Sequence, residues 1–281
     1  MAALPTFIIC GTQKGGTTSL YYYLYEHPKI YMAKNKEVRY FDLNYHRGVK
    51  WYKKHFNDFK SKKKTILGEA SPTYMYFEEV PERIKTLLPN VKLIFILRNP
   101  VDRAYSHYWH AINLGYEHLC FEEAIKKEEE RLSHGDLFQR QHYSYRDMGK
   151  YIVQLKRFRK YFPKEQMLII LTENLKDTPE KVMNRTFNFL EIEDDLASRN
   201  WQVNHLTGKQ PYIWKLQRLK SIMTYIPIAK GIVGRAIDTI NLREGYPRMN
   251  LEIRKDLLDY FKPYNKELER FLERKLDRWY K

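Results

Sequence analysis

A glycine-rich segment near the start of the chain constrains the fold more than any other feature. It runs from Gly11 to Ser19 and reads Gly-Thr-Gln-Lys-Gly-Gly-Thr-Thr-Ser. An apolar run, residues 7–10, precedes it, and a helix-compatible run, residues 20–25, follows it. A strand, a glycine-rich turn and a helix in this order direct backbone N–H groups and the positive end of the helix towards an anion. The segment therefore predicts a phosphate-binding loop.

The position of the lysine distinguishes this loop from an ATP-binding loop. A Walker A loop has the pattern G-x-x-x-x-G-K-[ST]. When Gly11 and Gly16 are aligned to its glycines, Thr17 occupies the place of the lysine. The lysine of this chain comes earlier, at Lys14. The pattern indicates a phosphate loop for a ligand other than ATP with magnesium.

Strand and helix patterns alternate along the chain. Short apolar runs predict buried strands at residues 7–10, 65–67, 92–97 and 167–171. Helical patterns at 80–88, 150–162 and 179–190 separate or follow them, the last with Thr178 as N-cap. The alternation predicts an α/β fold, a P-loop-like three-layer domain with a central parallel sheet flanked by helices. In such sheets ligands bind beyond the carboxyl ends of the strands.

The C-terminal part has a helical pattern. Asn250 is a candidate cap for a helix that runs to Phe261 and stops at Pro263, and an apolar stripe continues over residues 268–279. Residues 208–247 contain no clear strand and are interpreted as a lid over the site, a dimer surface or packed helices. Because the chain has no repeats or obvious linker, we predict a single domain over residues 1–281, with a homodimer as an open possibility.

The chain is basic, with 50 Lys and Arg against 34 Asp and Glu and a net charge of +16. Such a field attracts phosphates, sulfates, nucleic acid or anionic membranes. The basic residues are dispersed, which fits a small anionic substrate at least as well as nucleic acid. No apolar run approaches the roughly 18 residues of a membrane-spanning helix, and no leader pattern precedes the first strand. The expectation is a soluble cytoplasmic protein.

A second anion site is predicted after the strand at 92–97. That strand ends in Arg98, where an ATPase commonly has an acidic residue that serves magnesium. An arginine binds a phosphate through paired hydrogen bonds, and a helix that starts near Pro100 returns the hydroxyl of Ser106 towards the same anion. The alternative is a structural ion pair between Arg98 and a carboxylate. Two phosphate sites on neighbouring strands indicate a nucleotide that is phosphorylated at both ends of its ribose.

With these two motifs, the chain resembles the sulfotransferases that use 3'-phosphoadenosine 5'-phosphosulfate (PAPS), most closely their heparan-sulfate branch and its bacterial relatives. Residues 7–24 resemble the family's 5'-phosphosulfate loop, and residues 93–108 its 3'-phosphate motif. Shorter blocks at 37–42, 48–52, 68–74 and 172–175 also match, so the resemblance covers nearly the whole chain. It implies PAPS as donor, adenosine 3',5'-bisphosphate as product and no metal.

The resemblance also implies roles for individual residues. Lys14 would stabilise charge on the leaving phosphate oxygen, and Arg98 and Ser106 would bind the 3'-phosphate. Arg243, in a turn at 243–247 that resembles a family turn, would close on the same phosphate. The remaining donors to the 5'-phosphate would be Gly15, Gly16, Thr17, Thr18 and Ser19. Transfer would be an in-line displacement at sulfur, with preorganised donors at the leaving oxygen.

An acceptor hydroxyl or amine also needs a base, and Glu69 is the candidate. The family's catalytic glutamate is followed by a lysine, whereas here Ala70 follows Glu69, so another cation is expected to keep Glu69 ionised. The alternative is a turn carboxylate that caps Ser71 or pairs with a lysine. His110 is the alternative base. His107 precedes it by three places and would share its helix face.

Glu37, Tyr40, Tyr74 and His107 are candidates for the acceptor side, and the acceptor would be a small molecule, such as a natural product, or a glycan. Two other functions remain open. A P-loop nucleotide kinase has a similar fold, but Thr17 and Arg98 are unfavourable for it. A basic nucleic-acid-binding module explains the charge but not the two phosphate motifs.

Overall fold

The computed structural model describes residues 4–57, 59, 66–133, 136–192, 208–211, 213 and 236–281. The chain divides into two compact units, and each consists of two separate stretches. The first unit comprises Met1–Arg98 and Tyr151–His205, and the second comprises Asn99–Lys150 and Leu206–Lys281. That these units form a single domain stays a prediction.

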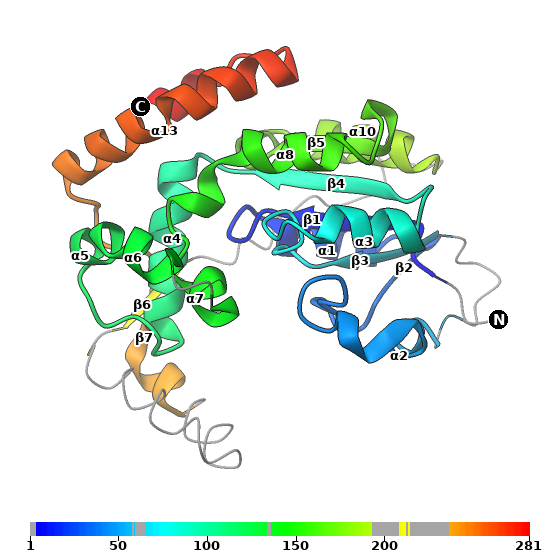
Figure 1. Cartoon of the computed structure of the whole chain (residues 1–281), viewed down its shortest axis with the longest axis horizontal. Helices are drawn as coiled ribbons and strands as arrows, with labels where there is room; N and C mark the ends of the chain where they lie inside the picture. Colours follow the sequence, from blue (N-terminus) through cyan, green and yellow to red (C-terminus); the bar gives the residue numbers. More distant parts are fainter. Residues whose placement is uncertain are drawn as a thin grey trace. The chain divides into compact units, whose positions relative to one another are not determined.

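The first unit contains a five-stranded parallel sheet in the order β2-β3-β1-β4-β5 (Figure 1). Its strands are β1 (Phe7–Gly11), β2 (Ile30–Met32), β3 (Ile66–Ala70), β4 (Lys92–Leu97) and β5 (Met167–Leu171). Every residue of β1 is buried, as expected for a central strand of a sheet that is covered on both faces. The predicted parallel α/β sheet is confirmed.

Helices cover both faces of this sheet. The helices of this unit are α1 (Thr17–Tyr25), α2 (Gly48–Lys54), α3 (Val80–Leu87), α8 (Tyr151–Arg159), α9 (Thr172–Asp177) and α10 (Pro179–Leu190), with short 3-10 helices at Tyr45–Arg47 and Lys164–Gln166. Leu24 of α1 and Phe187 of α10 belong to one apolar core with Ile94 of β4. Phe158 of α8 packs edge-on against Phe95 at 5.0 Å between ring centroids. Because successive strand residues point to opposite faces, α8 lies on the other face.

The structure corrects several sequence-based details in the first unit. The strand predicted at 65–67 runs from Ile66 to Ala70, so Glu69 lies within β3 and not beyond it. The short edge strand β2 was not predicted, because three residues carry too little pattern. Thr178 precedes α10 but makes no capping hydrogen bond; its hydroxyl instead donates to the carbonyl of Asn174 at 3.2 Å.

The second unit is built around α4 (Pro100–Asn113) and α13 (Leu251–Leu272). Its other described elements are α5 (Phe121–Lys126), α6 (Glu128–Ser133), α7 (Leu137–His142), β6 (Lys209–Pro211), β7 (Leu242–Glu244) and 3-10 helices at Asp147–Gly149 and Asp277–Tyr280. Val101 and Tyr108 of α4 share an apolar core with Phe261 of α13. The Asn99 side chain caps α4 by accepting a hydrogen bond from the N–H of Val101 at 3.0 Å.

The prediction that Pro263 ends the C-terminal helix was wrong. Helix α13 begins after the predicted cap Asn250 and continues through Pro263 to Leu272. A proline removes one helical hydrogen bond, but the buried face continues past it at helical spacing through Phe261, Asn265 and Leu268. Packing of this face therefore outweighs the local break. Leu276 and Trp279 of the predicted stripe are buried beyond the end of the helix.

The prediction of no strand in residues 208–247 was also wrong. β6 and β7 pair in antiparallel register, with Gln210 opposite Arg243. These short strands come from opposite ends of the segment, so no local pattern reveals their pairing. Residues 212 and 214–235, which carry most of the proposed lid or dimer surface, lie outside the described residues, as does the lysine-rich run at 60–64.

Candidate active site

The glycine-rich loop joins β1 to α1 in the first unit, as the sequence predicts. Gly16 is the N-cap residue of α1 with φ 103°, a left-handed conformation that favours glycine. Among the described residues, no side chain caps this end of the helix, and its first turn contains no acidic residue. The N–H groups in the first turn of a helix lack partners within the helix. This end of α1 is therefore free to bind an anion.

The loop is packed tightly against the end of β4. The N–H of Thr12 donates to the carbonyl of Ile96 at 2.8 Å, and the N–H of Gly15 donates to the carbonyl of Thr12 at 2.9 Å. A Cβ atom on Gly15 would lie 2.6 Å from the carbonyl oxygen of Ile96. Glycine is thus required at this position for the loop to approach the strand.

Arg98 lies beside the loop. Its Nη1 donates to the carbonyl of Lys14 at 3.3 Å, and its own carbonyl accepts a hydrogen bond from the hydroxyl of Tyr151 at 2.8 Å. Among the described residues Arg98 forms no ion pair, which argues against the structural-pair alternative. The structure thus brings two predicted cations, Lys14 and Arg98, to the same loop.

Three polar side chains at this loop were not singled out from the sequence. Thr12 Oγ1 and Gln13 Oε1 are buried and make no hydrogen bond within the described residues. The hydroxyl of Thr172 donates to the carbonyl of Gly15. In the sequence, residues 172–175 match the family only as a short block, and nothing local in them reveals a contact with the loop.

Glu69 is fully buried in β3 and is surrounded by hydroxyl groups. The hydroxyl of Tyr52 donates to Oε1 at 2.6 Å, and the hydroxyl of Ser71 donates to Oε2 at 3.3 Å. Burial raises the pKa of Glu69 to about 8, and the charge of Asp42 acts in the same direction. Hydrogen bonds from Tyr52, Tyr74 and Ser71 limit the rise. Within the part of the chain that the structure describes, no cation is a hydrogen-bond partner of Glu69, contrary to our expectation.

This buried carboxyl predicts a pH-dependent stability. Between the ordinary pKa of 4.5 and the raised pKa of about 8, folded Glu69 keeps a proton that the unfolded chain has released. The folded state then binds more protons, so this residue lowers the free energy of unfolding as pH rises, by at most about 1.4 kcal/mol per pH unit. We expect urea unfolding at pH 5, 6, 7 and 8 to show that the free energy of unfolding of Glu69→Gln increases relative to that of the unmodified protein as the pH rises. Parallel stability curves for the two proteins would contradict the raised pKa.

Tyr74, predicted on the acceptor side, is buried beside Glu69, and Tyr40, predicted on the same side, is buried against Tyr52. The ring of Tyr40 stacks on that of Tyr52 with centroids 4.4 Å apart. The Tyr74 hydroxyl accepts a hydrogen bond from the N–H of Phe41 at 3.2 Å. Glu37 is instead exposed and lies 3.4 Å from the ammonium of Lys36. The two tyrosines support Glu69 and its neighbours, while acceptor contacts of these three residues stay predictions.

An ion pair fixes the segment that carries Tyr40. Arg39 Nη2 lies 2.9 Å from Asp42 Oδ2, and the Thr73 hydroxyl donates to the same oxygen at 2.6 Å. The N–H of Arg39 also donates to the Ser71 hydroxyl at 3.0 Å. These bonds connect residues 39–42 to the turn after β3, on which Ser71 contacts Glu69.

In the second unit, Ser106 lies beside the turn at 243–247. Its Oγ is 3.2 Å from the hydroxyl of Tyr246, and the ring of Trp109 stacks on Tyr246 at 6.0 Å. Arg243 is exposed on β7. Two elements that the resemblance assigns to the 3'-phosphate therefore lie together within this unit.

The two candidate histidines of α4 differ in environment. His107 is fully buried, with Nδ1 3.3 Å from Nη1 of Arg103 and its ring packed edge-on against Tyr145 at 5.2 Å. His110 lies in the last turn of α4 and is partly exposed. His107 thus packs in the core of its unit, and His110 is the more accessible candidate for an acceptor role.

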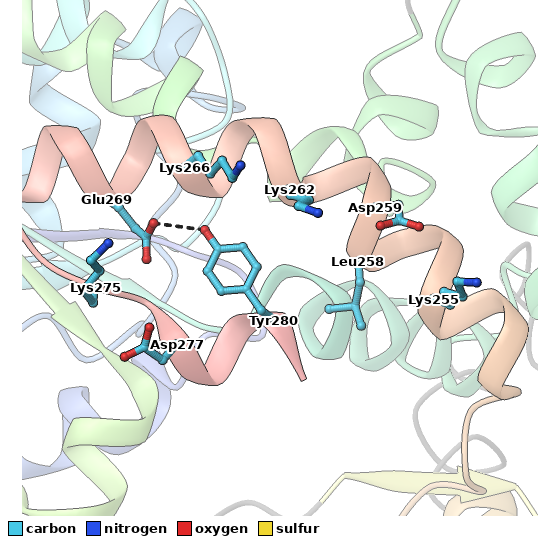
Figure 2. Close-up of a pocket in the computed structure, with 9 residues that line it drawn as sticks. All are labelled: Lys255, Leu258, Asp259, Lys262, Lys266, Glu269, Lys275, Asp277 and Tyr280. Atoms are coloured by element: carbon cyan, nitrogen blue, oxygen red, sulfur yellow. Dashed lines mark hydrogen bonds between the residues drawn. The ribbon is translucent and has the colours of Figure 1, made fainter.

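A separate pocket of about 440 Å³ lies along α13 and contains none of the predicted site residues (Figure 2). Its lining includes Leu258, and Tyr280 donates a hydrogen bond to Glu269 at 3.1 Å. Its charged lining consists of Lys255, Lys262, Lys266 and Lys275 with Asp259, Glu269 and Asp277. Because these charges nearly balance, the pocket does not favour an anion.

Within the described ranges, no group of three or more His, Cys, Asp or Glu side chains is arranged to hold a metal ion. The described helices also include none with the length and apolar character needed to cross a membrane. Cys10 is buried, and burial raises the pKa of its thiol well above the usual range. This thiol therefore serves as a small apolar side chain.

Comparison with known proteins identifies the family. The sulfotransferase domain family matches residues 4–223. The chain therefore belongs to the sulfotransferase family, and its enzyme class is sulfotransferase. A crystal structure of a sulfotransferase from Alicyclobacillus acidocaldarius aligns with a TM-score of 0.74 at 28% identity and covers 99% of this chain and 100% of that chain. This alignment confirms the predicted fold class.

Three relatives with named activities are similar to this chain, two over most of its length and one over less than half of it. The bifunctional heparan sulfate N-deacetylase/N-sulfotransferase 2 of Homo sapiens is 30% identical over 96% of this chain and 30% of that protein. The heparan sulfate glucosamine 3-O-sulfotransferase 3B1 of Mus musculus is 28% identical over 94% of this chain and 62% of that protein. The membrane-associated sulfotransferase kil1 of Dictyostelium discoideum is 40% identical over 44% of this chain and 29% of that protein. The chain thus spans less than two thirds of each relative.

Proposed function

We propose that this sulfotransferase moves the sulfuryl group of PAPS to a hydroxyl or amine of a glycan or small molecule. The observation that carries the proposal is the open N-terminus of α1, with Lys14 and Arg98 beside it. The donor groups in this part of the chain are backbone N–H groups, the hydroxyls of residues 17–19 and the side chains of Lys14 and Arg98. This set fits the phosphate and sulfate oxygens of PAPS. Membership in the sulfotransferase family supports it over the nucleotide kinase.

Two residues of the chain would act on the reaction, one at the acceptor atom and one at the leaving phosphate oxygen. Glu69 would accept the proton that the acceptor hydroxyl or amine loses as that atom bonds to sulfur. Lys14 would stabilise the negative charge that develops on the phosphate oxygen as the bond between it and sulfur breaks. PAPS, when bound, supplies a sulfuryl group on a phosphate leaving group. The pKa of about 8 makes Glu69 a stronger base than an ordinary carboxylate.

The donor proposal predicts ligand-induced stabilisation. Adenosine 3',5'-bisphosphate should raise the melting temperature without magnesium, because binding to the native state stabilises it by about 2.7 kcal/mol at 100 times the Kd. Differential scanning fluorimetry with and without a chelator measures this rise. Equal protection by ATP with magnesium, and none by the bisphosphate, would overturn the donor assignment.

The names of the relatives indicate which type of chemical group is sulfated, but not which acceptor molecule carries it. The N-sulfotransferase relative is named for N-sulfation and the 3-O-sulfotransferase for O-sulfation of heparan sulfate. Their names favour a glycan amine or hydroxyl for this chain, ahead of a small natural product. Radiolabelled donor incubated with fractionated extract of the source organism would identify the acceptor. A cytoplasmic location, a homodimer and the absence of a nucleic-acid partner stay predictions.

A further inference from the structure

Thr172 connects three parts of the nucleotide site that are distant in sequence. It is the first residue of α9 and follows β5 directly. Its hydroxyl donates to the carbonyl of Gly15, 157 residues away in sequence, and lies 2.9 Å from the carbonyl oxygen of Leu97. A Cβ atom on Gly16 would lie 3.6 Å from the Thr172 methyl carbon. One side chain thus contacts the loop and the end of the strand that precedes Arg98.

The bond to Gly15 determines how one peptide group of the loop is oriented. In a trans peptide the C=O of one residue and the N–H of the next point in opposite directions. Because the Gly15 carbonyl points to Thr172, the Gly16 N–H points away from it. Among the described residues this N–H makes no hydrogen bond with the protein. It is therefore available to a ligand.

Without a restraint, this peptide group would have more than one orientation. Gly15 and Gly16 both lack a Cβ atom, and Gly16 has φ 103°, so rotation of the peptide between them meets little steric resistance. The close approach of Gly15 to Ile96 fixes where the Gly15 backbone lies, but it does not select the direction of the carbonyl that follows. A hydrogen bond donated to that carbonyl selects its direction.

We propose that Thr172 is a positioning residue that orients the Gly15–Gly16 peptide so that the Gly16 N–H donates to the bound phosphate. The inference deepens the proposed function, because the phosphate is that of the adenosine nucleotide. Thr172 does not itself contact the reacting atoms. It acts through the loop.

Replacing Thr172 with valine tests this role, because valine keeps the shape and removes the donor. The dissociation constant for adenosine 3',5'-bisphosphate should rise about 10- to 100-fold, as expected when a buried carbonyl loses its partner and a phosphate donor is misoriented. Thr172→Ser keeps the hydroxyl and should restore affinity to within a few-fold. The matched control is Thr186→Val, which removes a buried hydroxyl that donates to Val182 at 2.8 Å within α10. Its nucleotide affinity should remain unchanged.

Hydrogen exchange without any ligand separates this inference from the nucleotide assignment. Amides of residues 12–18 should exchange faster in Thr172→Val than in the unmodified protein and in Thr172→Ser, whereas amides of α10 should not change. If the unmodified protein binds no bisphosphate, the nucleotide assignment fails, and the exchange comparison still decides the positioning role. Unchanged exchange at residues 12–18, or unchanged affinity in a protein that binds the bisphosphate, would overturn the inference.

Discussion

Replacing Glu69 with glutamine is expected to slow sulfuryl transfer by about 10²- to 10⁴-fold, the usual contribution of a general base. Glutamine has nearly the same shape and can still accept a hydrogen bond from Tyr52, but it cannot take a proton from the acceptor. Adenosine 3',5'-bisphosphate should bind with nearly unchanged affinity, because the phosphate loop is intact. Single-turnover transfer and calorimetric titration measure the two effects separately.

The pH profile gives this prediction a second readout. With a pKa of about 8, Glu69 is mostly protonated at neutral pH, so kcat/KM should rise about tenfold per pH unit up to about pH 8 and then level. Tyr52→Phe is the matched variant, because it leaves the carboxylate in place and removes the hydroxyl that donates to Oε1. This hydrogen bond stabilises the ionised form, so the rise should move to higher pH. Full activity in Glu69→Gln would instead assign the base to His110 or another group.

Replacing Lys14 with methionine is expected to lower kcat by about 10²- to 10³-fold, similar to the loss of one preorganised donor in an oxyanion site. Methionine keeps an unbranched side chain but removes the charge and the N–H donors of the ammonium. Because the leaving oxygen gains its charge in the transition state, kcat and kcat/KM should fall together, while affinity for the bisphosphate changes less. Steady-state kinetics over a range of donor concentrations measures this pattern.

Lys92→Met is the matched control for Lys14. Lys92 belongs to the same unit, but it lies at the first residue of β4, opposite the end that leads to Arg98, and pairs with Glu191 at 2.8 Å. Its replacement should leave transfer unchanged, because ligands of a parallel sheet bind at the carboxyl ends of its strands. A purely electrostatic effect of net charge would slow both variants equally. A rise in KM alone for Lys14→Met would assign Lys14 to ground-state binding.

The parts of the fold that were predicted correctly are those with strong local patterns. The strands at 92–97 and 167–171 and the helix at 179–190 have the predicted bounds, because apolar runs and helix-start residues mark them within a few positions. Pro263 misled the prediction, since its local effect is smaller than the packing of the helix face that continues beyond it. β6 and β7 were missed because their pairing is between distant residues.

The candidate site likewise has features that local motifs reveal and features that depend on tertiary packing. The glycine-rich loop, its displaced lysine and Arg98 after β4 were all recognisable from sequence, because each is a short motif next to a strand. The environment of Glu69 was not. We expected a cation near it, and the structure instead provides the hydroxyl of Tyr52, 17 residues away in sequence. Both the burial of the carboxyl and its partners depend on how β3 and α2 pack.

The sequence by itself determined that this chain has a parallel α/β sheet with a glycine-rich loop after its first strand, and the resemblance of its motifs determined the sulfotransferase class. Those properties are encoded in contiguous residues, where hydrophobic period, glycine conformation and motif spacing act locally. Only the tertiary structure decided the raised pKa of Glu69 and the anchoring of the Gly15 carbonyl by Thr172. Both depend on desolvation and hydrogen bonds between segments that meet only after the sheet has formed.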